Sequence, residues 1–119
     1  MGSIIRVTRE FTFEMAHVLT NYDGPCRNVH GHSYRLFVTL SGIPVNDINN
    51  PKNGMVIDFT ELKEIVIDKI INQFDHSVVV SKDFDMEKKG MMAKTFGNMV
   101  IVDYQPTCEN LVADIAGRI

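Results

Sequence analysis

The 119-residue chain has two cysteines, no cluster of lysine or arginine, and no long apolar run. Two thiols in different sequence contexts favour free cysteines in a reducing compartment over a disulfide framework. No stretch approaches the roughly 18 apolar residues of a membrane span, and the N-terminus lacks a charged-then-apolar signal pattern. Scattered charges with a net charge of −3 argue against nucleic-acid and membrane partners. These absences predict a cytoplasmic protein that acts on a small molecule.

The overall composition of the chain is typical of one small globular domain. Hydrophobic residues make up 45% of the chain and charged residues 23%. A domain of this length is near the size at which a chain can bury an adequate core unaided. We therefore expect a single domain over 1–119, and association with further copies would help to stabilise it.

Three of the four histidines fall within sixteen positions, as His17, His30 and His32. Residues 30–41 alternate in the manner of a β-strand, and so do residues 11–17, where His17 is in phase with the apolar positions. Positions i and i+2 of a strand point to the same face about 7 Å apart, so His30 and His32 can converge on one ion. If the two strands pair as antiparallel neighbours, His17 lies beside them.

Three neutral imidazoles with a vacant fourth position are typical of a catalytic zinc site. Two alternatives stay open at this point. Each histidine could be an ordinary structural residue at the end of a strand. Cys26 could also supply a fourth ligand, which would make a closed His3Cys site in a non-catalytic zinc protein.

The rest of the chain alternates turn signals with periodic apolar segments. Asp58 and Thr107 stand where helix N-caps are expected, and Leu111, Val112 and Ile115 are predicted to face inward. The first long helix should cover one face of the sheet. The predicted elements are strands at 4–17 and 30–41, loops at 18–29 and 46–54, a helix at 58–74, a turn at 75–76 before residues 77–80, one or two helical turns within 85–96, a short strand or extended segment at 99–104 and a helix from 107.

Five sequence blocks between residues 13 and 110 resemble, in order, those of the 6-pyruvoyltetrahydropterin synthase and 6-carboxytetrahydropterin synthase family. The three-residue spacer between Cys26 and His30 resembles the bacterial 6-carboxytetrahydropterin synthases of queuosine biosynthesis more than the animal enzymes of the biopterin branch. The pyruvoyl-forming activity remains the alternative. The blocks are Phe13-Glu14-Met15-Ala16-His17, Cys26 with His30-Gly31-His32, Gly54-Met55-Val56-Ile57-Asp58-Phe59 with Leu62, Asp75-His76, and Pro106-Thr107-Cys108-Glu109-Asn110.

The resemblance implies an α+β tunnelling fold (T-fold), an antiparallel sheet of four strands with two helices on one face. Subunits of the family join their sheets into a barrel and stack as a homohexamer. Family members also continue with two further antiparallel strands, the last of which carries a glutamate of the proton relay. This chain ends at Ile119, so we expect a C-terminally incomplete domain in which those strands are absent.

The resemblance also implies that the chain is a lyase. Its substrate is 7,8-dihydroneopterin triphosphate, which is converted to 6-carboxy-5,6,7,8-tetrahydropterin with loss of acetaldehyde and triphosphate. The three histidines would hold zinc (Zn²⁺), which polarises side-chain oxygens of the substrate. Cys26 would be the base, and His76, backed by Asp75 and contributed by a neighbouring subunit, would relay protons. Glu109, beside Thr107, would anchor the pterin ring.

Overall fold

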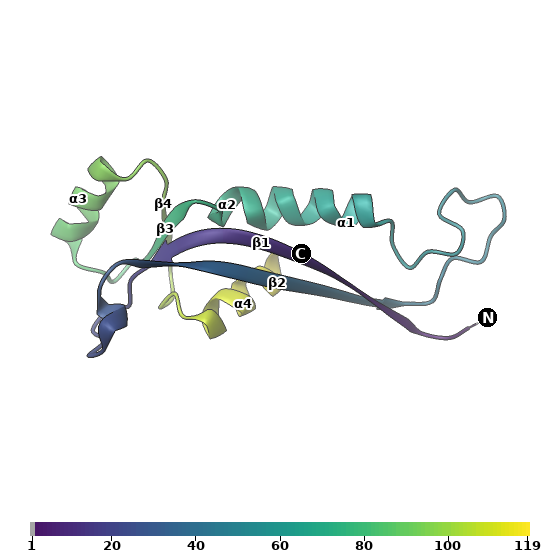
Figure 1. Ribbon diagram of the computed structural model, residues 1–119, viewed down its shortest axis with the longest axis horizontal. Helices are drawn as coiled ribbons and strands as arrows, with labels where there is room; N and C mark the ends of the chain where they lie inside the picture. Colours follow the sequence, from purple (N-terminus) through teal and green to yellow (C-terminus); the bar gives the residue numbers. More distant parts are fainter. Residues whose placement is uncertain (1) are drawn as a thin grey trace.

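The computed structural model describes residues 2–119, apart from the side chain of Cys26. Four strands and a series of helices follow one another along the chain (Figure 1). In order they are β1 (Ile5–His17), the 3-10 turn η1 (Pro25–Arg27), β2 (His30–Gly42), α1 (Phe59–Val66), the π-helical segment η2 (Ile67–Ile71), α2 (Asn72–Phe74), β3 (Ser77–Ser81), α3 (Met86–Thr95), β4 (Met99–Val102) and α4 (Cys108–Arg118).

A long β-hairpin is the largest element of the fold. Its strands β1 and β2 each have 13 residues and pair antiparallel from Ile5↔Gly42 to His17↔His30. Alternate residues face the core, because successive side chains of a strand point to opposite faces. Phe13, Met15, Leu36 and Val38 are buried on the inner face. Both predicted strands are confirmed.

The complete sheet is mixed, with the strand order β2-β1-β3-β4. Strand β3 runs parallel to β1, and β4 runs parallel to β3, so the expected all-antiparallel sheet is wrong for these two pairs. The path of the chain explains the difference. The helical segment from α1 to α2 runs back along the hairpin against the direction of β2, and β3 continues in that direction beside β1 (Figure 1). Helix α3 is then the crossover that parallel strands such as β3 and β4 require.

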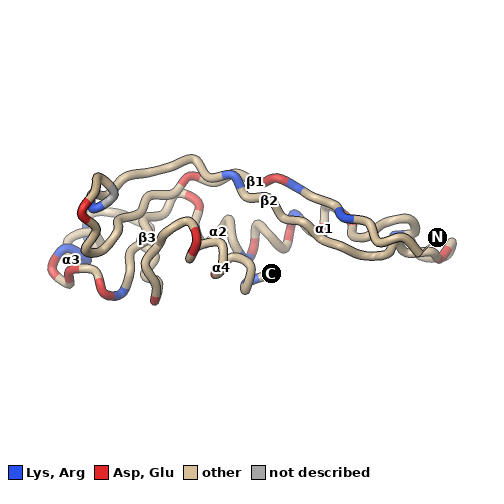
Figure 2. Tube along the Cα trace, turned by 90° about the horizontal axis from the view of Figure 1, so that it is seen from below, with Lys and Arg blue, Asp and Glu red and all other residues tan. Residues whose placement is uncertain are grey.

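Two helical segments cover the inner face of the hairpin, as predicted. Figure 2 shows α1, α2 and α4 on the same side of β1 and β2. Leu111 and Ile115 of α4 belong to the same buried cluster as Phe13 and Leu36 of the hairpin. The helix α3 packs separately, where Met92 joins a smaller cluster with Val18 and Val80. The architecture is therefore α+β, with the main core between the hairpin and the helices.

The segment from α1 to α2 buries one residue in every four. Leu62, Val66, Ile70 and Phe74 are all at most 1% exposed. In a regular α-helix, a step of four residues overshoots a full turn by about 40°, so such a row would drift around the helix. The π-helical segment Ile67–Ile71 lies in the middle of this row and widens the turn. The four side chains therefore stay directed at the hairpin.

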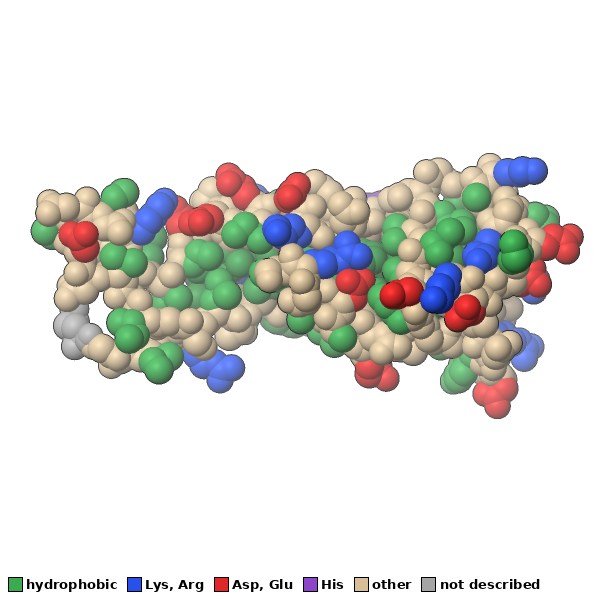
Figure 3. Space-filling model, turned by 180° about the vertical axis from the view of Figure 1, so that it is seen from behind, with side chains coloured by type: hydrophobic (Ala, Val, Ile, Leu, Met, Phe, Trp, Pro, Cys, Tyr) green, Lys and Arg blue, Asp and Glu red, His purple; other side chains and the backbone are tan. Residues whose placement is uncertain are grey.

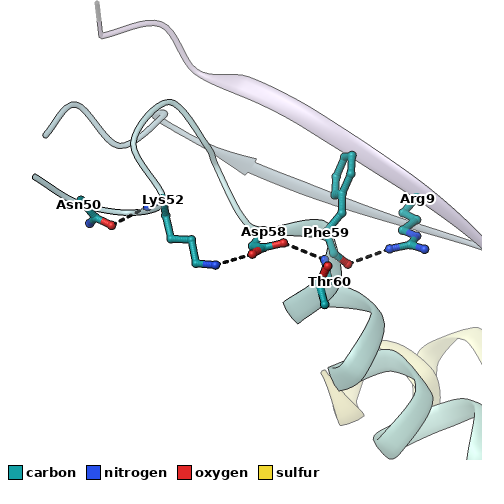
Figure 4. A network of polar contacts seen from close by, with 6 residues as sticks. All are labelled: Arg9, Asn50, Lys52, Asp58, Phe59 and Thr60. Carbon is teal, nitrogen blue, oxygen red and sulfur yellow. Dashed lines mark hydrogen bonds and ion pairs between the residues drawn. The ribbon is translucent and has the colours of Figure 1, made fainter. Parts of the chain in front are cut away.

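Polar contacts fix the start of α1 against the strand and the preceding loop (Figure 4). The Asp58 carboxylate accepts a hydrogen bond from the Thr60 N–H at 2.9 Å and pairs with Lys52. The Arg9 guanidinium donates to the Phe59 carbonyl at 2.8 Å. The hydrogen bond that Asp58 accepts from Lys52, together with the one from the Thr60 N–H, lowers the pKa of Asp58. The predicted N-cap is confirmed, because Asp58 satisfies an N–H that the first helical turn leaves free.

Acidic and basic residues alternate over the surface instead of gathering by sign. Figure 2 shows both kinds along the whole trace, and Figure 3 shows them intermingled on one face. Among residues 2–119, no helix combines the length and the apolar character that crossing a bilayer requires.

Helix α4 differs from the prediction at one position. Leu111 and Ile115 are buried as expected, but Val112 is 55% exposed. Since the core lies on one side of the helix, the residue next to Leu111, about 100° further round, points away from it.

We expect Ile115→Ala to lower the free energy of unfolding by about 2 to 5 kcal/mol, because it removes buried methylene groups and leaves a cavity. Val112→Ala should change it by no more than about 0.5 kcal/mol. Urea denaturation of the two variants measures the difference. Equal losses would mean that α4 presents a different face to the core.

Candidate metal centre

The hairpin register brings the three histidines together. His17 pairs with His30, and His32 lies opposite Met15, so all three side chains project from the inner face at one end of the hairpin. Each offers a ring nitrogen, and these nitrogens lie within 4.8 Å of one another. His17 is buried, His30 is half-buried and His32 is exposed. The predicted cluster is confirmed, and it opens toward solvent on the His32 side.

Two backbone carbonyls determine which nitrogens face the centre of the cluster. The His17 Nδ1 atom lies 2.7 Å from the Pro106 carbonyl oxygen, and the His30 Nδ1 atom lies 2.7 Å from that of Asn28. A carbonyl oxygen can only accept, so both Nδ1 atoms carry the proton. In the neutral rings, each Nε2 atom therefore has a free lone pair directed at the other histidine.

The two Nε2 atoms are 3.0 Å apart. Facing lone pairs at that distance repel each other unless a proton or a cation lies between them. In tetrahedral coordination with bonds of 2.0 to 2.1 Å, two nitrogen ligands stand about 3.3 Å apart. The second ring nitrogen of a metal-binding histidine usually donates to a carbonyl or carboxylate, as Nδ1 does here. The residues present therefore fit a metal ion that prefers imidazole ligands.

The environment of His17 favours the form that binds metal. Burial lowers its pKa, and the neighbouring His30 and His32 act in the same direction, which outweighs the opposite effect of the Pro106 carbonyl. A lowered pKa means that the ring is neutral over a wider pH range, and only the neutral ring has a free lone pair.

Cys26 lies in the turn η1, four residues before His30. Its side chain is outside the part of the chain that the structure describes. Its assignment as the base therefore stays a prediction, and so does the alternative in which its sulfur is a fourth ligand.

Asp75 and His76 form a pair that is held against β1. The His76 Nδ1 atom lies 3.0 Å from an Asp75 carboxylate oxygen. The Glu14 N–H donates to the same carboxylate at 2.9 Å, and the His76 N–H donates to the Glu14 carbonyl at 2.6 Å. The Glu14 N–H and the His76 ring lower the pKa of Asp75, although partial burial opposes them. These contacts also hold the His76 backbone at a φ of 60°. A residue other than glycine adopts this left-handed conformation only at a cost in free energy.

This pair is separate from the histidine cluster of its own chain. It contacts Glu14, which lies three residues before His17 and so roughly 10 Å away along the strand. Neither residue belongs to the metal-ligating group found among the described residues. The imidazole of His76 remains largely exposed, with 77% of its side-chain surface accessible. The His76 ring is thus open to solvent.

The start of α4 lies next to the cluster. Thr107 is the N-cap, as predicted, and its hydroxyl accepts a hydrogen bond from the Asn110 N–H at 3.2 Å. The preceding residue is Pro106, whose carbonyl holds His17. Glu109 is exposed in the first turn of α4. The structure therefore brings this segment to the metal ligands, while the binding role of Thr107 and Glu109 stays a prediction.

Several residues at the site were not predicted. The carbonyls of Asn28 and Pro106 are main-chain groups, which no residue pattern reveals. Tyr34 could have been found, because it follows His32 on the same face of β2. Its ring packs edge-on against His32, with centroids 5.7 Å apart, and stacks on Phe13. Burial, with a further contribution from Cys108 of α4, raises its pKa to about 12.

Comparisons with known proteins identify the family of this chain. A family model described as 6-pyruvoyl tetrahydropterin synthase matches residues 6–119. The chain belongs to this family. A 6-carboxy-5,6,7,8-tetrahydropterin synthase from Haemophilus influenzae is 34% identical over 122 residues, which cover 98% of this chain and 82% of that protein. An enzyme of the same description from Rickettsia felis is 28% identical over 98% of this chain and 80% of its own length.

Solved structures show the same fold. The 6-pyruvoyl tetrahydropterin synthase of Caenorhabditis elegans superposes with a TM-score of 0.63 at 26% identity, over 98% of this chain and 77% of that chain. An uncharacterized protein from Wolinella succinogenes gives a TM-score of 0.70 at 18% identity, over 93% of this chain and 80% of that chain. The T-fold relationship expected from the sequence is confirmed, although the sheet described here is mixed.

His30→Ala should reduce bound metal to a small fraction of the wild-type stoichiometry, because it removes one of three ligands and the partner of His17. His76→Ala is the matched control, since it removes the one histidine outside the cluster. Elemental analysis of the purified proteins gives the metal content. Full metal content in His30→Ala would end the assignment of this ligand set.

Proposed function

We propose that this chain is a zinc-dependent 6-carboxy-5,6,7,8-tetrahydropterin synthase of queuosine biosynthesis. It would convert 7,8-dihydroneopterin triphosphate to 6-carboxy-5,6,7,8-tetrahydropterin with release of acetaldehyde and triphosphate. The observation that carries the proposal is the open cluster of His17, His30 and His32 in a chain related to a named 6-carboxytetrahydropterin synthase over nearly its whole length. Zinc is the ion best suited to three imidazoles with an open position.

The histidine cluster gives the substrate a defined place to react. Zinc, when bound, would act as a Lewis acid toward oxygens of the substrate side chain and so make the adjacent C–H more acidic. The exposed His32 leaves that side of the cluster accessible, while His17 is buried and held by Pro106. Cys26, four residues before His30, would take the proton as a thiolate, a form that a nearby cation favours.

The remaining groups would bind the substrate and move protons. An Asp75 carboxylate oxygen lies 3.0 Å from the His76 Nδ1 atom, so Asp75 can orient that ring. Glu109 in the first turn of α4 would accept two N–H bonds from the amino-pyrimidinone edge of the pterin, beside Thr107. The position of α4 supports this role, because Pro106, which leads into it, contacts a metal ligand.

Identification of the product by mass tests the proposed activity. The zinc-loaded protein, incubated with 7,8-dihydroneopterin triphosphate, should form 6-carboxytetrahydropterin and one equivalent of acetaldehyde. A product that keeps the three-carbon side chain would instead assign the 6-pyruvoyltetrahydropterin synthase reaction. No turnover, together with a Cys26 thiol that resists alkylation while zinc is bound, would support the closed structural site.

We further propose that the enzyme is a cytoplasmic homohexamer whose sites are shared between subunits. The exposed imidazole of His76 and its distance along β1 from the cluster support a role in a neighbouring molecule. Cys26→Ala and His76→Ala should each keep zinc and lose about 10²- to 10⁴-fold in turnover, the usual contribution of acid–base groups. Hexamers reassembled from both variants should regain part of the activity, because some sites would combine both intact residues.

Native mass spectrometry would verify that the reassembled oligomers contain both variants. A reassembled sample of Cys26→Ala subunits alone is the control for the procedure. Mixed oligomers without any recovery would place Cys26 and His76 in the site of one subunit.

A further inference from the structure

The side chain of Gln105 joins two parts of the chain that are far apart in sequence. The Thr20 N–H donates to its Oε1 atom at 2.9 Å, and its Nε2 atom donates to the Thr20 carbonyl at 2.9 Å. The Gln105 amide thus hydrogen-bonds to both the N–H and the carbonyl of Thr20, as a residue of a neighbouring β-strand would. Both hydrogen bonds are partly buried, so their loss would leave backbone groups poorly solvated.

These bonds close a ring of contacts that contains a metal ligand. Thr20 lies three residues after His17, and Gln105 immediately precedes Pro106. The Pro106 carbonyl accepts the His17 Nδ1–H at 2.7 Å. The ring therefore runs from His17 along the backbone to Thr20, through the Gln105 amide to Pro106, and back to His17. The Gln105 amide therefore links the segment that bears the Pro106 carbonyl to the chain three residues after His17.

Few hydrogen bonds hold that carbonyl in place, although the Pro106 ring itself is fully buried. Residues 103–107 lie between β4 and α4 and form no regular element. Proline has no N–H, so Pro106 cannot be fixed by a backbone hydrogen bond of its own. The Gln105 carbonyl accepts the Thr107 N–H at 2.7 Å and the Asn110 side-chain amide at 3.0 Å, which tie it to the start of α4. The Gln105 side chain supplies the connection to the other end, next to His17.

We propose that Gln105 is a positioning residue for the metal centre. It holds the Pro106 carbonyl so that His17 keeps its proton on Nδ1 and directs Nε2 toward His30. It does not touch the metal or the substrate, and it acts only through the backbone on either side. The inference rests on the proposed metal centre and adds a residue to it.

Gln105→Met tests this role, because methionine has similar length but can form neither hydrogen bond. The variant should bind zinc about 10-fold more weakly than the wild type in competition with a chelator, within the 10- to 100-fold range typical of residues that orient metal ligands. The His17 Nδ1–H proton should exchange faster with water when followed by NMR in the metal-free protein, since its acceptor is no longer fixed.

Tyr104→Phe is the matched control. It removes one partly buried hydrogen bond, from the Tyr104 hydroxyl to Asp114, at the neighbouring position of the same segment. It should lower the melting temperature as Gln105→Met does, but leave zinc affinity and the exchange of the His17 proton unchanged. If the role of Gln105 were only structural, Gln105→Met and Tyr104→Phe would both lower the melting temperature, and neither would change zinc affinity or the exchange of the His17 proton.

If Gln105→Met does not fold, Gln105→Glu serves as the second test variant. It keeps the acceptor for the Thr20 N–H, loses the donor to the Thr20 carbonyl, and should also weaken zinc binding. Zinc affinity within twofold of the wild type in a folded Gln105 variant would overturn the inference, and so would weaker binding with an unchanged His17 proton. Failure of the wild type to bind zinc would contradict the proposed metal centre itself.

Discussion

The structure depends on the register in which β1 and β2 pair. That register sets His17 opposite His30 and places both in phase with the apolar side chains of the inner face. A shift of one residue would turn every side chain of one strand to the other face, so it would expose the core and separate the ligands at once. Burial of Phe13, Met15 and Leu36 beneath the helices therefore also determines where the metal ligands lie.

The site lies where the covered part of the hairpin ends. The apolar row continues into His17, which is buried, while His32 on the neighbouring strand is exposed. Polarity thus rises across a few ångströms, from a core that lowers the pKa of His17 to a side of the cluster that is open to solvent. The segment that leads into α4 lies against His17 and contributes the Pro106 carbonyl.

The sequence predicted those features that depend on local periodicity. Alternation along β1 and β2 is a property of neighbouring residues, and it was enough to place His17, His30 and His32 on one face. The direction of β3 depends on the path of the helices before it, which no local pattern contains. Val112 was predicted to face inward together with Leu111 and Ile115, but the rotation of α4 is set by its packing, and Val112 is exposed. The backbone carbonyls and the Gln105 contacts arise from residues far apart in sequence, so they required the three-dimensional structure.

The π-helical segment Ile67–Ile71 has a consequence for how this family can change in length. A wide turn of this kind is what results when one residue is inserted into an α-helix without displacing either end. Deletion of one residue here would restore a regular helix in which Leu62 and Phe74 stand eleven steps apart, close to three full turns. Phe74 would then stay in the core, and the Asp75–His76 pair would keep its place beside Glu14. The local irregularity therefore allows the chain to differ by one residue at this point without moving a proposed catalytic pair.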